Sequence, residues 1–449
     1  MSNLLGSVWW LIVSIGILVT FHEFGHFWVA RRFGVHVIRF SVGFGKPLWS
    51  RLGRDGTEYA IAAIPLGGYV KMLDEREFEV PEADLHKAFN RKPVLQRMAI
   101  VVAGPAFNFL LCFVLLWAMF VIGKPDYLPI VGRADGIAAQ AGFEPGERVL
   151  SVDGKDAPTW AHAELLLIGA AQDRRNARVE VERADGGHAL RLLPLQQIAA
   201  GLGEAQVLGA IGLVPRQFLL PPVIDSISAD GPRDVLRPGD RIVRVGDTPI
   251  ASFDQIGPAL KLQAHAGEPL RLRIVRGGQT SDVTVLPRLR PIGDGSQRLS
   301  IGITAQSRDA AYDTVRRYGP IAALGVSAHE TWRLTSESLG MLWRMASGHA
   351  SLTGVSGPIA IAQYANASAQ LGVAWFLFFL AILSLSLGIM NLLPIPILDG
   401  GHLLYYLIEL VKGSPVSERA LAMGQYIGLA LLGALMCLAF YNDILRQFS

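Results

Sequence analysis

The chain has 449 residues, of which 51% are hydrophobic and only 18% are charged. A water-soluble domain carries about 25% charged residues, so some segments of this chain are expected to avoid water. The formal net charge of +3 is too small to indicate a nucleic-acid-binding protein. The two cysteines, Cys112 and Cys437, lie far apart in apolar runs, which excludes a disulfide framework and a cysteine zinc site.

Four apolar segments are long enough to cross a bilayer, which takes about 20 helical residues. They are expected at about 4–30, 99–123, 371–398 and 420–441. The first segment lacks the basic start of a signal peptide and is longer than its apolar region, so we interpret it as a retained anchor. The predicted fold class is a polytopic α-helical membrane protein with four transmembrane helices, whose membrane core is made of residues 1–125 and 371–449.

The loop between the first two segments is rich in Lys and Arg, including Arg31, Arg32, Arg91 and Lys92. Short loops with this bias face the cytoplasm. The long block between the second and third segments is then expected on the opposite side of the membrane.

The middle block contains an internal repeat. Residues 145–154 (PGERVLSVDG) are echoed by residues 238–247 (PGDRIVRVGD), and a helical stretch and a β-branched strand follow each copy. This order predicts two inserted PDZ-like α+β domains, at 126–211 and 212–310. The alternative is two unrelated small β domains that share a turn motif. Residues 311–370 are expected to form a helical connector, whose stretch 312–346 suits either an interfacial or a soluble helix.

A candidate metal site lies in the last turns of the first segment, where His22, Glu23 and His26 form the pattern His-Glu-x-x-His. On a helix, positions i and i+4 share a face, so both imidazoles can reach one Zn²⁺ while the Glu takes a proton from bound water. Ionisable residues in a membrane span are costly and rarely lack a role. The alternative is a structural His/Glu cluster between helices.

A catalytic zinc takes three protein ligands and keeps one position open. Asp399 is the candidate third ligand, because it is the first acid after the third segment and shares the depth of the His pair under the expected topology. Taken alone, an Asp at a helix end is more often a boundary residue. His402 is the rival ligand, although a boundary role suits it better.

Two further segments are expected near the site. In the second membrane segment, Gly104 and Pro105 permit close helix packing, and Asn108 needs a polar partner in lipid, most simply as structural glue. Residues 58–73 suggest two short strands around a Pro-Leu-Gly-Gly turn. We interpret them as a re-entrant hairpin whose edge pairs with an extended substrate, through residues that include Ile61, Gly67, Gly68 and Val70. The alternative is a surface hairpin on the cytoplasmic side.

Taken in this order, the motifs resemble those of the site-2 protease family over nearly the whole chain. The resemblance implies one Zn²⁺ ion held by His22, His26 and Asp399, with Glu23 as the catalytic acid/base and Asn391 helping to hold the substrate backbone. It also implies regulated intramembrane proteolysis in a bacterial inner membrane, with the PDZ-like pair on the periplasmic side. The expected substrate is a pre-clipped single-span protein such as an anti-sigma factor, and remnant signal peptides are a further candidate.

Two other functions are compatible with part of this pattern. A membrane scaffold or chaperone could bind peptide C-termini at the PDZ-like domains without catalysis, but it has no use for the Glu23 carboxylate. A metal transporter would need a chain of intramembrane ligands rather than one buried site. The sequence therefore favours a protease.

Overall fold

The computed structural model describes residues 2–77, 79–199, 202, 204–291, 297–306, 311–349 and 356–448. The chain divides into two compact units. Unit 1 combines Met1–Pro125 with Val315–Phe448, and unit 2 is the inserted block Asp126–Thr314. Both ends of the sequence therefore build the same unit.

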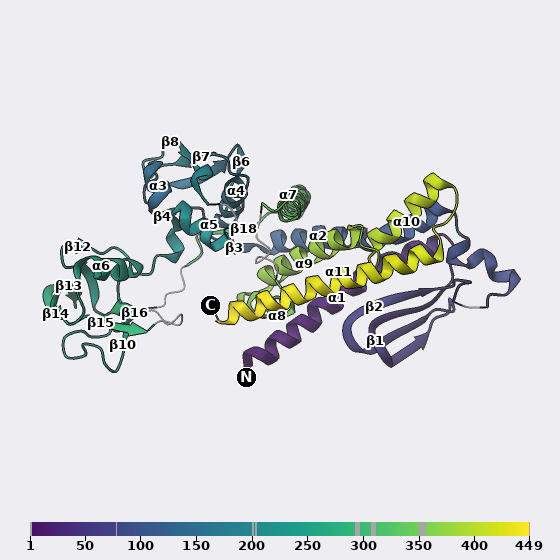
Figure 1. Cartoon of the computed structure of the whole chain (residues 1–449), viewed down its shortest axis with the longest axis horizontal. Coiled ribbons are helices and arrows are strands. Elements are labelled where there is room, and N and C mark those ends of the chain that lie inside the picture. The colour runs from purple at the N-terminus through teal and green to yellow at the C-terminus, as the bar shows by residue number, and fades with distance from the viewer. Residues whose placement is uncertain are drawn as a thin grey trace. The chain divides into compact units, whose positions relative to one another are not determined.

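Within the described residues, unit 1 has four helices long and apolar enough to cross a membrane. They are α1 (Ser2–Arg32), α2 (Val94–Ile122), α9 (Val373–Leu392) and α11 (Glu418–Phe448). Figure 1 shows these four helices running in a similar direction. Helix α2 packs against both α1 and α9 around a buried apolar core that includes Leu18, Leu116, Phe120, Leu380 and Leu385.

Helices α1 and α2 approach each other at backbone distance beside the His pair. A Cβ atom built on Gly25 would lie 2.4 Å from the carbonyl oxygen of Ala103. Any side chain at position 25 would therefore force the two helices apart, and the imidazoles with them.

The third apolar helix is shorter than the predicted segment 371–398. Helix α9 ends at Leu392, and α10 (Asp399–Lys412) begins after a short irregular stretch. Pro394 and Pro396 interrupt the helix because they lack a backbone N–H and disfavour helical geometry in the residue before them. Asp399 therefore starts a new helix rather than ending the third span.

The expected self-paired hairpin at 58–73 is wrong. These residues form one continuous strand, β2 (Glu58–Met72), which pairs with β1 (Val37–Leu52). Phe40 of β1 lies opposite both Val70 and Tyr59, so the first part of β1 runs between the two ends of β2.

Two glycines in β1 explain why residues 58–73 do not pair with themselves. Gly43 and Gly45 have φ angles of 94° and 88°, which favour glycine, and they bend β1 between its two paired parts. Gly67 of β2 packs directly on the ring of Phe44, so the Pro-Leu-Gly-Gly stretch lies against β1 instead of turning back.

The remaining elements of unit 1 connect and brace these parts. Two 3₁₀ turns, η1 (Glu82–Lys87) and η2 (Phe89–Arg91), precede α2. Helix α7 (Pro320–Ala346) packs on α2, and Figure 1 shows it end-on, across the direction of the long helices. Helix α8 (Pro358–Leu371) packs on α1. The buried carboxylate of Asp443 in α11 accepts hydrogen bonds from the backbone N–H groups of Gly357, Ile359 and Ala360 and so caps α8.

Unit 2 contains two four-stranded sheets with the same strand order. The orders are β6-β5-β7-β8 and β12-β11-β13-β14. In each, a helix (α4 or α6) lies between the second and third strands along the chain. The elements of unit 2 are β4 (Val131–Ala134), α3 (Gly136–Gln140), β5 (Arg148–Val152), β6 (Lys155–Asp156), α4 (Trp160–Gln172), β7 (Ala177–Glu182), β8 (His188–Leu193), η3 (Leu195–Gln197), α5 (Glu204–Ile211), β9 (Leu213–Pro215), η4 (Arg216–Phe218), β10 (Ile224–Ile227), β11 (Arg241–Val245), β12 (Thr248–Pro249), η5 (Phe253–Gln255), α6 (Ile256–Gln263), β13 (Leu270–Arg276), β14 (Gln279–Val285), β15 (Arg288–Pro291), β16 (Gln297–Ser300) and β17 (Ile303–Ala305). The paired strands β3 (Lys124–Asp126) and β18 (Thr314–Arg316) contain its first and last residues.

The repeated Pro-Gly-acid motif has the same structural role in both halves of unit 2. The buried carboxylates of Glu147 and Asp240 each accept a hydrogen bond from the backbone N–H three residues earlier, at 3.1 and 2.8 Å. Each also pairs with an arginine, Arg191 for Glu147 and Arg276 for Asp240. The acid thus fixes the turn that leads into the first strand of each sheet.

Candidate metal centre

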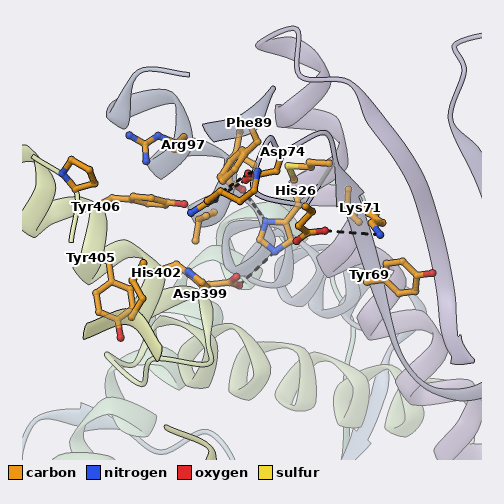
Figure 2. Close-up of a pocket in the computed structure, with 18 of the residues that line it drawn as sticks. His26, Tyr69, Lys71, Asp74, Phe89, Arg97, Asp399, His402, Tyr405 and Tyr406 are labelled. Atoms are coloured by element: carbon orange, nitrogen blue, oxygen red, sulfur yellow. Dashed lines mark hydrogen bonds and ion pairs between the residues drawn. The ribbon is translucent and has the colours of Figure 1, made fainter. Parts of the chain in front are cut away.

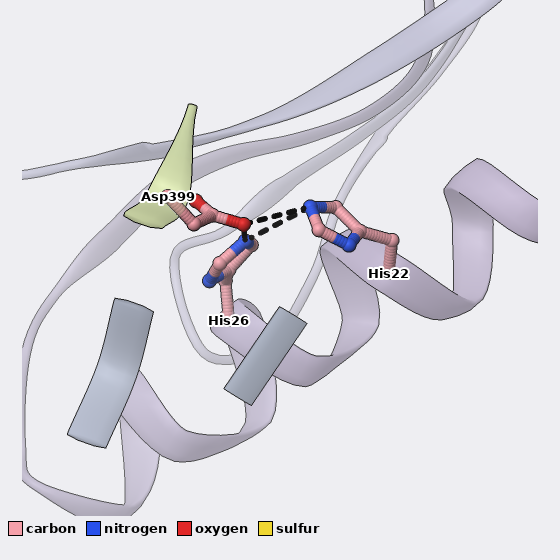
Figure 3. A group of neighbouring side chains, drawn as sticks. All are labelled: His22, His26 and Asp399. Carbon is pink, nitrogen blue, oxygen red and sulfur yellow. Dashed lines mark hydrogen bonds and ion pairs between the residues drawn. The ribbon is translucent and has the colours of Figure 1, made fainter. Parts of the chain in front are cut away.

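Helix α1 presents two imidazoles to the carboxylate that begins α10 (Figure 3). Asp399 Oδ2 lies 3.3 Å from His22 Nε2 and 3.5 Å from His26 Nε2. One ligand atom from each of the three residues falls within 4.8 Å of the others. Two distant parts of the sequence therefore meet as one group of metal-ligating side chains.

Helix α2 fixes the orientation of both imidazoles. His26 Nδ1 lies 2.8 Å from the carbonyl oxygen of Ile100, which can only accept, so Nδ1 carries the proton and Nε2 keeps its lone pair. Asn108, which is fully buried, places its side-chain amide 3.0 Å from His22 Nδ1. Such partners of the far ring nitrogen set the orientation of metal-binding histidines.

Space for the imidazoles depends on Gly104 in α2. A Cβ atom at this position would lie 2.2 Å from His26 Nε2 and 2.8 Å from His22 Cε1. Pro105 follows it inside the helix and is buried. The sequence predicted that this stretch permits close helix packing. In the structure, the absence of a side chain at Gly104 leaves the space that the two imidazoles occupy.

The three side chains suit a zinc ion. Two neutral imidazole nitrogens and one carboxylate oxygen are a common catalytic zinc ligand set, which leaves a fourth position for water. Asp399 Oδ2 is buried and has no hydrogen-bond partner among the described residues, as expected for an atom that faces a cation. His402 does not belong to this group of three.

The group opens into a cavity of about 1010 Å³. Figure 2 shows His26 and Asp399 facing it from one side and Tyr69 and Lys71 from the other. Glu23 also lines the cavity, as does Val70 of β2. A carboxylate beside the three ligating groups, in a space that can admit a peptide, is the arrangement that metal-assisted hydrolysis requires.

Two titratable side chains of α10 have shifted pKa values. Burial disfavours the charged form of Asp399, but the neighbouring His22 and His26 outweigh it and hold the pKa of this carboxyl below its usual range. Burial lowers the pKa of His402, which therefore favours the neutral imidazole at pH 7. The site therefore offers an anionic oxygen to a cation.

The other predicted site residues lie at different distances from this centre. Val70 lines the cavity, and Gly68 packs against Glu23, since a Cβ on Gly68 would lie 3.3 Å from Glu23 Cγ. Ile61 and Gly67 lie elsewhere in the β1–β2 sheet, and Asn391 lies in the last turn of α9; none of the three is among the cavity-lining residues.

Two contacts of the site escaped the sequence-based prediction. The Ile100 carbonyl is a backbone group and carries no signal in the sequence. Arg97 and Glu409 form a partly buried ion pair between α2 and α10, and both line the cavity. In the sequence, the Arg97–Glu409 pair was indicated only by the charge of Arg97 in the first turn of an apolar helix.

The fold and the site define a zinc metalloprotease with membrane-capable helices. Residues 10–435 match the model of peptidase family M50, and the chain belongs to that family. A relative in Xylella fastidiosa (strain Temecula1), named as a zinc metalloprotease, is 50% identical over 449 residues, covering 99% of this chain and 100% of its own.

Other relatives carry more specific names. The regulator of sigma-E protease RseP of Escherichia coli (strain K12) is 41% identical over 441 residues, covering 97% of each chain. The protein of the same name in Salmonella typhimurium (strain 14028s) is 40% identical over 453 residues, covering 99% of this chain and 100% of its own. The family resemblance inferred from the motifs is therefore confirmed.

Proposed function

We propose that this protein is an intramembrane zinc metalloprotease that performs regulated intramembrane proteolysis. The observation that carries the proposal is the meeting of His22, His26 and Asp399 beside Glu23, in a unit built from apolar helices. The names of its sigma-E protease relatives support the same activity.

The topology proposed for this activity has four spans, namely α1, α2, α9 and α11. The loop that holds the β1–β2 sheet faces the cytoplasm, because it is rich in Lys and Arg. Unit 2 then lies on the periplasmic side of a bacterial inner membrane. The ligands on α1 and α10 both lie toward the cytoplasmic side in this arrangement.

In the proposed mechanism, His22, His26 and Asp399 hold one zinc ion. Bound Zn²⁺ supplies a Lewis acid that polarises the scissile carbonyl and acidifies a water molecule. Glu23 takes the proton of that water on its carboxylate and delivers it to the leaving amine nitrogen. Glu23 lies on the cavity wall, packed against Gly68 of β2.

Substrate binding is proposed at the edge of β2. A helical substrate must unwind to expose a peptide bond, and its freed backbone groups then need partners. Among the described strands, Tyr69–Met72 pair with β1 on one side, and these four residues line the cavity on the other. An extended substrate that adds to this edge places its backbone beside Glu23. This replaces the hairpin of the sequence-based prediction with a sheet edge.

The two halves of unit 2 are proposed to be tandem PDZ-like domains. Their common strand order and repeated acid-led turn support a shared fold. On the periplasmic side, such a pair would exclude substrates with large extracytoplasmic parts and would also offer grooves for peptide C-termini. The substrate class that fits this filter is a pre-clipped single-span protein, such as an anti-sigma factor, or a remnant signal peptide.

A cleavage comparison tests the proposed function. The purified chain and its Glu23→Gln form are mixed with a truncated single-span substrate in detergent or vesicles, and fragment release and bound zinc are measured. We expect equal zinc in both proteins and fragment release by the unchanged chain alone. Cleavage by Glu23→Gln would refute the role of Glu23, and His22→Ala should lose both zinc and cleavage.

A further inference from the structure

Helix α10 presents Asp399 and three other cavity-lining residues along one side. Asp399, His402, Tyr406 and Glu409 follow the spacing i, i+3, i+7 and i+10, which places them on neighbouring positions of one helical face. The chain before Asp399 is irregular, so α10 is not a rigid extension of α9. The rotation of α10 about its own axis therefore decides where the Asp399 carboxylate points.

Arg97 of α2 contacts Glu409 and Tyr406 at the far end of this face. Its Nη2 and Nη1 atoms donate to Oε1 and Oε2 of Glu409 at 2.7 and 3.1 Å. Its Cζ atom lies 4.8 Å from the centre of the Tyr406 ring. The side chains of Arg97 and Glu409 are only 13% and 14% exposed, so solvent screens this pair weakly.

The guanidinium of Arg97 is also held by the chain just before α2. Its Nε donates to the carbonyl oxygen of Lys92 at 3.0 Å, so all three nitrogens of the planar group have partners. Because the planar guanidinium is hydrogen-bonded through all three nitrogens, it fixes the orientation of the Glu409 carboxylate as well as its distance. A lysine ammonium group has no such plane and would fix the distance alone. Figure 2 shows Arg97 and Tyr406 on the same wall of the cavity.

The same helix orients the other two ligands. The Ile100 carbonyl, one turn after Arg97, holds His26, and Asn108 further along holds His22. Helix α2 thus acts as a common frame, to which Arg97 attaches the element that carries the third ligand. Metal sites tolerate ligand displacements of only about 0.2 Å, so a small rotation of α10 suffices to remove Asp399 from the coordination sphere.

We propose that Arg97, acting through Glu409 and Tyr406, is a positioning residue that fixes the rotation of α10 and so holds Asp399 at ligand distance. This inference rests on the zinc ligands proposed above. An ion pair with a purely structural role would change the stability of the metal-free protein. A positioning pair also changes metal affinity and coordination geometry.

The test measures metal binding by the full-length protein in detergent. The variants are Glu409→Gln, Arg97→Lys and the double variant Arg97→Gln/Glu409→Gln. Zinc affinity is measured by competition with a chelator, and the visible absorption of the Co²⁺ form reports the coordination geometry. We expect zinc binding to weaken by roughly 10- to 100-fold in Glu409→Gln, the range found for residues that orient metal ligands.

The other two variants test whether the residues act as a pair. Arg97→Lys keeps the charge but not the fork, so its zinc affinity should fall between those of the unchanged protein and Glu409→Gln. The double variant should bind zinc about as weakly as Glu409→Gln, because both substitutions remove one shared interaction. The Co²⁺ spectrum should change in all three.

The chain offers a matched control in Arg91 and Glu75. These residues form another Arg–Glu pair in unit 1, at 2.9 Å, and neither lines the cavity. Arg91→Lys and Glu75→Gln should leave zinc affinity and the Co²⁺ spectrum unchanged. Thermal unfolding of each metal-free variant shows that it is folded, and Arg97→Lys decides the test if the neutral variants are not.

The outcomes separate this inference from the proposed function. If the unchanged protein takes up no zinc, the ligand assignment fails. If it binds zinc and folded Arg97 and Glu409 variants bind equally tightly with the same Co²⁺ spectrum, only the positioning role of Arg97 is overturned.

Discussion

The side-chain amide of Asn108 lies 3.0 Å from His22 Nδ1, on the far side of the ring from Asp399. When His22 Nε2 binds a metal, Nδ1 carries the proton and needs an acceptor. Asn108 Oδ1 is buried and has no hydrogen-bond partner in the part of the chain that the structure describes. Exchanging the oxygen and nitrogen of this amide gives Nδ1–H its acceptor. We therefore expect the Asn108 carbonyl oxygen to face His22 when Nε2 binds a metal.

This assignment predicts the effect of replacing Asn108. Asn108→Leu removes the acceptor at similar volume and should weaken zinc binding about 10- to 100-fold, whereas Asn108→Asp keeps an acceptor and should weaken it less. Ser384→Ala is the control, because its hydroxyl bonds the backbone carbonyl of Asn108 and not the imidazole. Equal zinc affinity in Asn108→Leu and the unchanged protein would contradict the role.

Gly104→Ala should abolish zinc binding. The added methyl group would lie 2.2 Å from His26 Nε2, so the imidazole would have to leave its position. Alanine otherwise favours helices over glycine by about 1 kcal/mol, so the helix itself should not suffer. Gly16→Ala in α1 is the matched control, since nothing lies within 4 Å of its added Cβ. Zinc content after chelator challenge, measured alongside helicity, distinguishes the two variants.

The sequence was sufficient to predict that His22, His26 and Asp399 form one group, but not to predict the contacts that hold them in place. His-Glu-x-x-His has a helical spacing, and the depth expected for Asp399 after the third apolar segment matches that of the His pair. The two prolines that end α9 were visible in the sequence, but the length of the apolar run outweighed them in the prediction. The partners of Arg97 and His26 come from other helices, and local periodicity carries no record of such contacts.

The strand pairing of the β1–β2 sheet also could not be predicted from local sequence. Alternation of apolar residues and a Pro-Leu-Gly-Gly stretch correctly indicated strands in 58–73, but strand partners depend on the whole loop. The bend at Gly43 lets β1 run between both ends of β2, which removes the option of self-pairing. Neither end of β2 can be assigned a neighbour from its own residues.

Acid should selectively weaken the second half of unit 2 through Asp240. Its carboxylate is buried, and the bidentate contacts of Arg276, at 2.6 Å, hold its pKa below the ordinary value despite its burial. A lowered folded-state pKa means that the stabilisation is fully present above the unfolded pKa of about 3.9 and is lost as pH falls through the folded-state pKa.

Replacing Asp240 tests this pH dependence. Asp240→Asn should destabilise this half by about 2 kcal/mol at pH 7, and the difference from the unchanged protein should shrink below about pH 4. Asp282→Asn removes a more exposed partner of Arg273 and should cost about 0–1 kcal/mol. Hydrogen-exchange protection of β11 and β13, corrected for intrinsic rates, measures both. A difference for Asp240→Asn that persists at low pH would contradict the linkage.

The sheet edge at Tyr69–Met72 should bind substrate in an extended conformation. Lys71 lines the cavity from this edge, so Lys71→Cys can form disulfides with single cysteines placed along the substrate span in a Glu23→Gln background. Strand pairing brings every second substrate residue to the same face, whereas an intact helix repeats every 3.6 residues. We expect crosslinking yields to alternate with a period of two. Trp49→Cys, on the other outer strand of the sheet, is the control and should crosslink weakly. A helical period at Lys71, or equal yields at both edges, would show that the substrate does not extend β2.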